Sequence, residues 1–198
     1  VDIDSNSLIV LKALLDTMII PENISINFIN DDFLLHDFTI KYDIVIGNPP
    51  YKKITKEKDL LKRYKCGLYN KDTNNIFSFF IEKSLTLGDY VSLIVPKSLI
   101  NAPEFNKTRE LLNKHRITNI FDFGEKGFKG VKIETVCFIA QPGKSPKSTI
   151  VESYITNKHV AYNQSYITDS AYPYWLIYRN EDFDTVADRM TFNIFKAY

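Results

Sequence analysis

An apolar run that stops at two prolines is the feature that most constrains how this chain can fold. Residues 42–47 read Tyr-Asp-Ile-Val-Ile-Gly and lead directly into Asn48-Pro49-Pro50-Tyr51. A short apolar run of this kind predicts a buried parallel strand, and prolines cannot continue its hydrogen-bond ladder because they lack a backbone N–H. We therefore expect a rigid loop at the carboxyl end of a strand, where open α/β sheets place their ligands.

Strand-like and helix-like segments alternate along the rest of the chain. We expect strands at residues 24–29, 43–46, 90–95, 117–123 and 135–140, and helices at residues 8–19, 74–87, 103–115 and 181–190. Ser5 is expected to cap the first helix, Pro21 to end it, and Gly88 to follow the second. This alternation predicts an open, mostly parallel sheet with helices on both faces and an antiparallel last strand.

The composition predicts a division into segments. Residues 1–141 carry the alternating pattern, residues 142–149 are expected to be a linker rich in Pro, Gly and Ser, and residues 150–198 are expected to begin a second domain. This last segment is rich in aromatic residues and has no strand–helix rhythm. The chain starts with Val1 instead of Met and opens on what resembles the end of a strand, so we interpret it as a piece of a longer protein.

Composition also narrows the classes of function. The net charge is +1, so any surface that attracts nucleic acid must be local. Two cysteines and three scattered histidines lack the spacing of a disulfide framework or a metal site, and no metal is expected. No apolar run reaches the roughly 20 residues of a membrane span and there is no signal peptide, so a cytoplasmic protein is expected.

The loop Asn48-Pro49-Pro50-Tyr51 has the chemistry of a binding site for a flat amino group. Asn48 offers a side-chain carbonyl, the prolines leave backbone carbonyls without local competitors, and Tyr51 offers an aromatic face. The structural alternative is a tight turn that contains two prolines. The loop resembles the signature of S-adenosylmethionine-dependent amino-methyltransferases, which include adenine-N6 DNA methyltransferases, RNA methyltransferases and glutamine methyltransferases of release factors.

Two carboxylates near expected strand ends are candidates for nucleoside binding. Asp2 could accept the hydroxyls of a ribose, and Asp32 could take an exocyclic N–H of an adenine while Phe33 packs on its ring. Taken one at a time, each has a plain structural alternative: Asp2 as a cap or turn residue, and Asp32 as a loop acid beside a core phenylalanine.

The order of these segments strengthens the resemblance. Val1-Asp2-Ile3-Asp4, then Asn30 to Leu35, then the Asn48 loop closely resemble the gamma-class adenine-N6 DNA methyltransferases of type II restriction–modification systems. The resemblance continues through residues 75–85, 88–96, 120–124, 127–131 and 134–136, and so covers about residues 1–140. It implies a partial class I methyltransferase fold that is Rossmann-like, with residues 1–141 as the catalytic domain and residues 150–198 as the start of a target-recognition domain.

The same resemblance implies roles for individual residues. Asp2 and Ile3 would hold the ribose and adenine of S-adenosylmethionine, with Asp32 and Phe33 on the adenine. Asn48 and the Pro49 carbonyl would accept the N6–H bonds of the target adenine, Pro50 would keep the loop rigid, and Tyr51 and Phe128 would contact the flipped base; Asn48 is also counted with the cofactor residues. Double-stranded DNA is the implied partner, together with a nuclease domain or subunit, in a prokaryotic cytoplasm.

A basic segment follows the loop. Lys52, Lys53 and Lys56 are the first of several cations there, against two carboxylates up to residue 65. They predict a flap that contacts DNA phosphates, and the alternative is an ordinary solvated face.

Departures from the family leave other functions open. The glycine-rich cofactor loop should precede Asp2 and does not occur in this sequence, so we expect the chain by itself to bind cofactor poorly and not to select a DNA sequence. An RNA or release-factor glutamine methyltransferase, and a non-catalytic DNA-binding module with a methyltransferase fold, are the alternatives.

Overall fold

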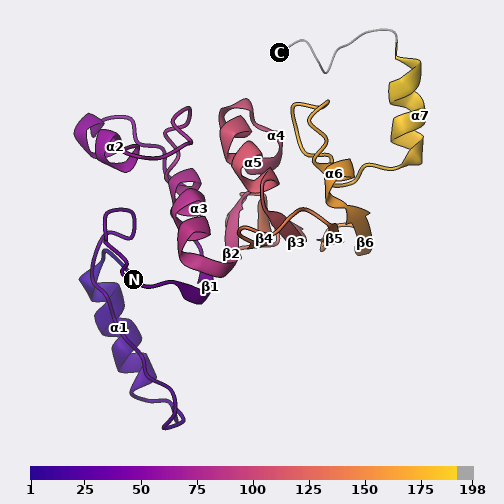
Figure 1. Cartoon of the computed structure of the whole chain (residues 1–198). Helices are drawn as coiled ribbons and strands as arrows, with labels where there is room; N and C mark the ends of the chain where they lie inside the picture. Colours follow the sequence, from indigo (N-terminus) through magenta and orange to yellow (C-terminus); the bar gives the residue numbers. More distant parts are fainter. Residues whose placement is uncertain (191–198) are drawn as a thin grey trace. The chain divides into compact units, whose positions relative to one another are not determined.

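The computed structural model describes residues 1–190, which form two compact units with a boundary between Thr39 and Ile40. The N-terminal unit is Val1–Thr39 and the C-terminal unit begins at Ile40 (Figure 1). The sheet and most of the buried core belong to the C-terminal unit. Part of the predicted last domain, residues 191–198, lies outside the described residues.

The N-terminal unit contains one helix, α1 (Ser5–Leu15). Its cap is Asp4 and not Ser5 as predicted, because the Asp4 carboxylate accepts hydrogen bonds from the backbone N of Asn6 (3.0 Å) and from Oγ of Ser7 (2.7 Å). The helix also ends at Leu15, before the predicted end at residue 19. No residue of α1 is buried, so little tertiary packing supports its last turn.

The predicted strand at residues 24–29 is wrong. The structure has no strand there; the segment is joined to the start of the chain by a single parallel bridge between Asp2 and Asn30. Alternation of apolar residues selects a strand only if a neighbouring strand supplies backbone partners. Ile24 and Ile26 remain 52% and 41% exposed, so the apolar side chains that suggested a strand are not buried here.

The C-terminal unit is built on a six-stranded sheet in the order β1-β2-β4-β3-β5-β6. Its strands are β1 (Tyr42–Gly47), β2 (Gly88–Pro96), β3 (Arg116–Gly124), β4 (Thr135–Gln141), β5 (Ser148–Ser153) and β6 (Lys158–Asn163). The ladders β1–β2 and β3–β5 are parallel, and the other three are antiparallel. β1, β2, β3 and β5 therefore run in one direction, and β4 lies antiparallel between β2 and β3. This confirms the predicted antiparallel direction of the strand at residues 135–140, although β5 and β6 follow it and it is not the last strand.

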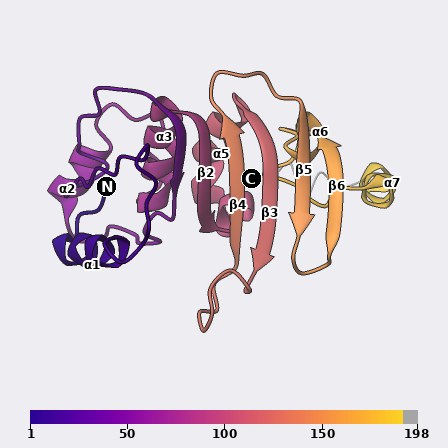
Figure 2. The ribbon, with the colours of Figure 1, turned by 90° about the horizontal axis from the view of Figure 1, so that it is seen from below.

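Helices cover one face of this sheet. The described helices of the unit are α2 (Lys58–Tyr64), α3 (Ile76–Leu87), α4 (Ser98–Asn101), the 3₁₀ helix η1 (Pro103–Phe105), α5 (Asn106–Asn113), α6 (Gln164–Ile167) and α7 (Glu181–Arg189). Figures 1 and 2 show α3, α4 and α5 on the same side of β2, β4 and β3. Within this unit, the prediction of helices on both faces is confirmed for one face only. On the opposite face, Tyr90 of β2 is 44% exposed.

The core lies between α3, α5 and the covered face of the sheet. Phe77 and Ile81 of α3 meet Val91 and Leu93 of β2, all of them at most 2% exposed. Burying each such side chain contributes roughly 1.5–3 kcal/mol. The parallel ladder between β1 and β2 places these strands side by side, so their carboxyl ends lie at the same edge.

Gly88 directly follows α3, as predicted. Its φ is −111°, which is extended backbone, and it is the first residue of β2. A Cβ there would lie 2.9 Å from Cγ2 of Val45. Close packing of β2 against β1 therefore explains the glycine, and no positive φ is needed.

The sheet continues across the predicted linker. The segment 142–149 forms a turn and the beginning of β5, and β5 pairs in parallel with β3. Residues 148–163 therefore share the sheet of β1–β4. The assignment of residues 150–198 to a target-recognition domain stays a prediction.

Candidate active site

Loops from three parallel strands meet at the carboxyl edge of the sheet. β1 leads into Asn48, β2 leads into Lys97, and β3 leads into the loop that carries Phe128. Because these strands run in the same direction, their loops share one edge. This is the edge at which open α/β sheets bind ligands.

Tyr51 is held in place from two sides. Its hydroxyl donates a 3.1 Å hydrogen bond to the Ile94 carbonyl, and its ring packs edge-on against Phe77, with ring centres 6.5 Å apart. Burial, together with the nearby thiol of Cys137, raises the pKa of Tyr51 to about 12. Tyr51 therefore presents a neutral, oriented ring.

The predicted pair of aromatic residues is brought together. The ring centres of Tyr51 and Phe128 lie 6.4 Å apart at an interplanar angle of 66°. They are separated by 77 positions in the chain and come from different loops. Both rings are half-buried, which leaves each with solvent-facing surface.

The remaining residues of the Asn48 loop differ in exposure. Asn48 and Pro50 are exposed, whereas Pro49 is buried. Within residues 1–190, the Asn48 side chain makes no hydrogen bond to protein, so its carbonyl oxygen can accept one from a ligand. Buried Pro49 anchors the centre of the loop, and the hydrogen bond from the Tyr51 hydroxyl to the Ile94 carbonyl fixes its end.

An ion pair that the sequence analysis did not identify supports the Phe128 loop. Nζ of Lys97 lies 2.8 Å from Oδ2 of the fully buried Asp122 and 3.9 Å from Oε1 of Glu134. The backbone N of Lys97 also donates to the Glu134 carbonyl at 2.9 Å. Asp122 and Glu134 stand at the two ends of the loop, so Lys97 joins both ends.

The Phe128 loop also packs directly on β4. A Cβ at Gly127 would lie 2.2 Å from Oγ1 of Thr135, the first residue of that strand. Only a residue without a side chain permits this approach. Gly127 thereby sets the position from which Phe128 reaches Tyr51.

In the N-terminal unit, the two predicted cofactor segments are also brought together. The backbone N of Asp31 donates to the Asp2 carbonyl at 3.1 Å, and the backbone N of Asp2 donates to the Ile29 carbonyl at 3.0 Å. Nδ2 of Asn30 donates to the carbonyls of Asp2 (3.0 Å) and Ile3 (3.1 Å). Asn30 is a supporting residue that the sequence analysis did not identify.

The side chains of this cluster have local partners of their own. The Asp2 carboxylate accepts from the backbone N of Asp4 at 2.9 Å, and Asp32 accepts from the backbone N of Leu34 at 2.9 Å. The ring centres of Phe33 and Phe38 lie 5.4 Å apart. Ile3 is 70% exposed, so its apolar surface is open to a ligand. Two carboxylates and two apolar side chains suit an adenosine group.

The three predicted phosphate-binding lysines differ from one another. Nζ of Lys53 forms an ion pair with Glu104 at 3.1 Å, and Nζ of Lys52 lies 4.0 Å from Glu57. Lys56 is exposed. Of the three, Lys56 is the best placed to meet a phosphate, because Lys53 already has a strong partner.

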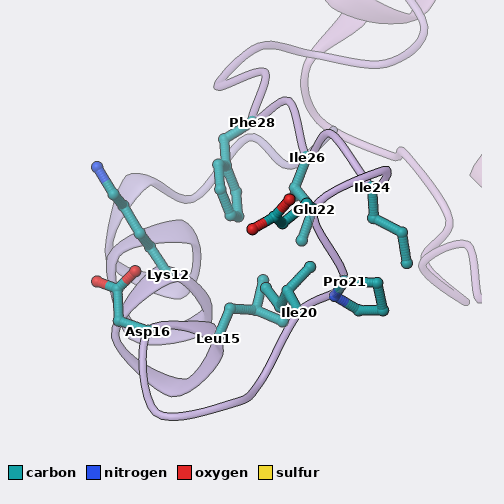
Figure 3. A pocket seen from close by; sticks show the side chains of 9 residues that line it. All are labelled: Lys12, Leu15, Asp16, Ile20, Pro21, Glu22, Ile24, Ile26 and Phe28. Carbon is teal, nitrogen blue, oxygen red and sulfur yellow. The ribbon is translucent and has the colours of Figure 1, made fainter.

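A separate hollow of about 330 Å³ lies in the N-terminal unit, beside the end of α1. Figure 3 shows Leu15 and Ile20 on one side and Phe28 on the other, with the Glu22 carboxylate between them. Its lining includes neither Asp2 nor Asp32, so it is distinct from the predicted cofactor cluster. Within the described residues, no helix has the length and apolarity to cross a membrane.

Comparisons with known proteins identify relatives of this chain. Residues 5–128 match the model of the Eco57I restriction-modification methylase family. The type II methyltransferase M.VspI of Vibrio sp. (strain 343) is 34% identical over 104 residues, which are 50% of this chain and 25% of that protein. The type II methyltransferase M.TthHB8I of Thermus thermophilus is 30% identical over 118 residues, 53% of this chain and 27% of that protein. The chain spans about a quarter of the length of these relatives.

Solved structures show the same fold. A methyltransferase subunit of a type I restriction-modification system from Streptococcus thermophilus aligns with a TM-score of 0.51 at 16% identity, over 66% of this chain and 32% of that one. A Listeria monocytogenes protein assigned as a candidate class I S-adenosylmethionine-dependent methyltransferase aligns with a TM-score of 0.50 at 17% identity, over 61% of this chain and 39% of that one. The fold is therefore α/β and part of the class I methyltransferase fold, as the sequence predicted. Because the family model covers well over half of the sequence, this chain belongs to the Eco57I restriction-modification methylase family.

Proposed function

We propose that this chain is part of a DNA methyltransferase of a restriction–modification system, which transfers a methyl group from S-adenosylmethionine to the N6 amino group of adenine. The observation that carries the proposal is the Asn48-Pro49-Pro50-Tyr51 loop, which follows β1 with the Tyr51 ring beside Phe128. The family supports a methylase of a restriction–modification system. The amino-group acceptors and the aromatic pair support adenine.

The target base is held by the C-terminal unit. Asn48 and the Pro49 carbonyl accept the two N6–H bonds, and these acceptors stabilise the positive charge that develops on nitrogen during transfer. The base has to leave the duplex to reach them. Packing on Tyr51 offsets part of the cost of unstacking, at roughly 1–3 kcal/mol for a base on an aromatic ring.

The cofactor residues belong to the N-terminal unit. S-adenosylmethionine supplies an already activated methyl group, so the protein contributes mainly position. Asp2 accepts the ribose hydroxyls, Ile3 covers the adenine, Asp32 accepts its amino N–H, and Phe33 packs on its ring. The bridge between Asp2 and Asn30 supports this assignment because it joins the two segments that carry these side chains.

Duplex DNA is the substrate in this proposal. Lys56, with smaller contributions from Lys52 and Lys53, contacts phosphates next to the flipped adenine. The complete protein acts in a prokaryotic cytoplasm, with a nuclease domain or subunit as a further partner.

The test is methyl transfer by the complete protein that carries this sequence. DNA is incubated with methyl-labelled S-adenosylmethionine and digested to nucleosides. We expect label in N6-methyladenine that disappears in Asn48→Ala and persists in Asn101→Ala, which alters an exposed asparagine at the end of α4.

Other results would redirect the assignment. Label in RNA or in a protein glutamine, with none in DNA, would replace the substrate. Cofactor binding without any transfer to these acceptors, or no cofactor binding at all, would favour a non-catalytic DNA-binding module.

A further inference from the structure

A hollow with a basic rim lies on the segment between Tyr51 and α3. It has a volume of about 490 Å³ and is lined by Lys58, Leu61, Lys62, Lys65, Cys66 and Lys71. Among the described residues, no carboxylate lines it. It belongs to the basic segment that follows the Asn48 loop, but its lining does not include Lys52, Lys53 or Lys56, the lysines to which the proposed function assigns phosphate contacts.

Lys65 holds the hollow together. Its Nζ donates to the Lys71 carbonyl at 2.7 Å and to Oδ1 of Asn74 at 2.8 Å. Burial lowers the pKa of Lys65. Lys65 therefore connects α2 with the chain before α3, and the three exposed ammonium groups that remain for a ligand are those of Lys58, Lys62 and Lys71.

The nearby carboxylates lie outside the lining of the hollow, although the charge of Asp72 acts on Lys65. Asp72 forms an ion pair with Lys107 at 3.2 Å, and Glu57 lies 4.0 Å from Lys52. Asp59 is on α2 but does not line the hollow. Four of the six residues that line the hollow are lysines, in a chain whose net charge is only +1.

The frame of the hollow is anchored to the core. At the base of the segment, the backbone N of Ile54 donates to the Asn74 carbonyl at 3.0 Å, and Ile54 is 1% exposed. The Tyr64 ring of α2 packs 6.3 Å from the Phe79 ring of α3. Figure 1 shows α2 near the start of α3. These contacts hold the backbone that carries the lysines, which lowers the entropic cost of binding a ligand.

We propose that this hollow binds a backbone phosphate of DNA. The inference rests on the proposed function, because the segment starts at Tyr51 and the strand that supplies the flipped base is the polyanion expected there. Lys58, Lys62 and Lys71 contact phosphate oxygens, while Leu61 and the lysine stems supply an apolar floor. A free phosphate ion shares this chemistry, and the experiment separates the two sources.

The first measurement is the salt dependence of DNA binding by the complete protein. Each lost phosphate contact lowers the slope of log Kd against log salt by about 0.9. We expect the triple variant Lys58→Gln, Lys62→Gln, Lys71→Gln to lower the slope by about 2 to 3. The matched control is Lys144→Gln, Lys147→Gln, Lys158→Gln, which removes the same charge from exposed lysines around β5 and β6. An equal fall in both would mean that net charge alone matters and would overturn the proposal.

The second measurement uses Cys66 as a reporter in the lining of the hollow. Cys66 is exposed and Cys137 is buried. Alkylation followed by peptide mass spectrometry therefore measures the accessibility of Cys66, with Cys137 as an internal reference. We expect duplex DNA to slow alkylation of Cys66 several-fold and inorganic phosphate at the same phosphate concentration not to do so. Bound DNA without protection would overturn the proposal, and equal protection by inorganic phosphate would replace DNA by a free anion.

The two proposals fail in different ways. Protection of Cys66 and a reduced slope in a protein that transfers no methyl group would leave this site standing and remove the enzymatic function. Methyl transfer, together with an unchanged salt slope in the triple variant and no protection of Cys66 by DNA, would leave the enzymatic function standing and remove this site.

Discussion

The hydroxyl of Tyr51 donates a hydrogen bond to the backbone carbonyl of Ile94, at 3.1 Å. This bond connects the loop after β1 to the neighbouring strand β2, close to where that strand ends. It orients the aromatic ring that is proposed to hold the flipped adenine. In this proposal the Tyr51 side chain has two separable functions: the hydroxyl orients the ring, and the ring stacks on the adenine.

Substitutions at Tyr51 should separate these functions. Tyr51→Phe keeps the ring and loses one hydrogen bond, worth about 1 kcal/mol, so we expect kcat/KM to fall less than about tenfold. Tyr51→Ala also loses the stacking surface, worth about 1–3 kcal/mol, and should cost a further factor of roughly 5 to 150. Single-turnover methylation and the fluorescence of 2-aminopurine at the target position measure both effects. Equal losses in the two variants would show that the ring does not stack on the base.

The pH dependence tests the raised pKa of Tyr51. A folded-state pKa of about 12 lies above the ordinary value of about 10, so the phenol stays protonated at neutral and mildly alkaline pH. We expect wild type and Tyr51→Phe to have methylation profiles of the same shape between about pH 7 and about pH 10. An alkaline limb that disappears in Tyr51→Phe would contradict this.

The same shift has a consequence for stability. Between about pH 10 and about pH 12 the unfolded chain releases the Tyr51 proton while the folded chain retains it. The stability from burying the neutral phenol is thus fully present below about pH 10 and is lost as the pH rises towards about 12. Urea unfolding should show a smaller loss over this interval in Tyr51→Phe than in wild type.

Lys97 and Asp122 provide a test of the support for the Phe128 loop. Lys97→Met leaves the buried carboxylate of Asp122 without its cation, which should cost about 3–5 kcal/mol. The double variant Lys97→Met, Asp122→Asn removes both charges and should recover part of that loss. Lys126→Met is the control, since exposed Lys126 donates to the Tyr154 carbonyl and makes no ion pair within residues 1–190. Urea midpoints compare the four proteins; a double variant less stable than Lys97→Met would argue against charge pairing as the cause.

Asn30 tests the cofactor cluster of the N-terminal unit. Asn30→Ala removes the two hydrogen bonds to the carbonyls of Asp2 and Ile3, each worth roughly 0.5–1 kcal/mol at an exposed site. We expect the Kd of S-adenosylhomocysteine to rise roughly tenfold by calorimetry. Asn23→Ala, an exposed asparagine in the turn after α1, should leave it unchanged. An unchanged Kd for Asn30→Ala would separate Asn30 from cofactor binding.

Segments with strong local patterns could be predicted from the sequence. β1, the helix α3 and the antiparallel strand β4 all appear close to their predicted positions. The predicted burial of β1 is wrong, because Ile44 and Ile46 are 64% and 80% exposed. Residues 24–29 could not be predicted in this way, because their alternation does not reveal whether a partner strand is present. The strand β5 was equally hidden, since its pairing with β3 depends on residues more than 25 positions away.

The residues of the candidate site also divide into those that the sequence predicted and those that only the structure revealed. The sequence by itself determined the family, the Asn48-Pro49-Pro50-Tyr51 loop and the basic segment after it, because these are short motifs whose chemistry lies in adjacent residues. Only the tertiary structure decided that Tyr51 bonds Ile94, that Lys97 joins Asp122 to Glu134, and that Lys53 is paired with Glu104 while Lys58, Lys62 and Lys71 surround a hollow. Hydrogen bonds and ion pairs form between groups that folding brings within a few ångströms, and distance along the chain carries no information about which groups those are.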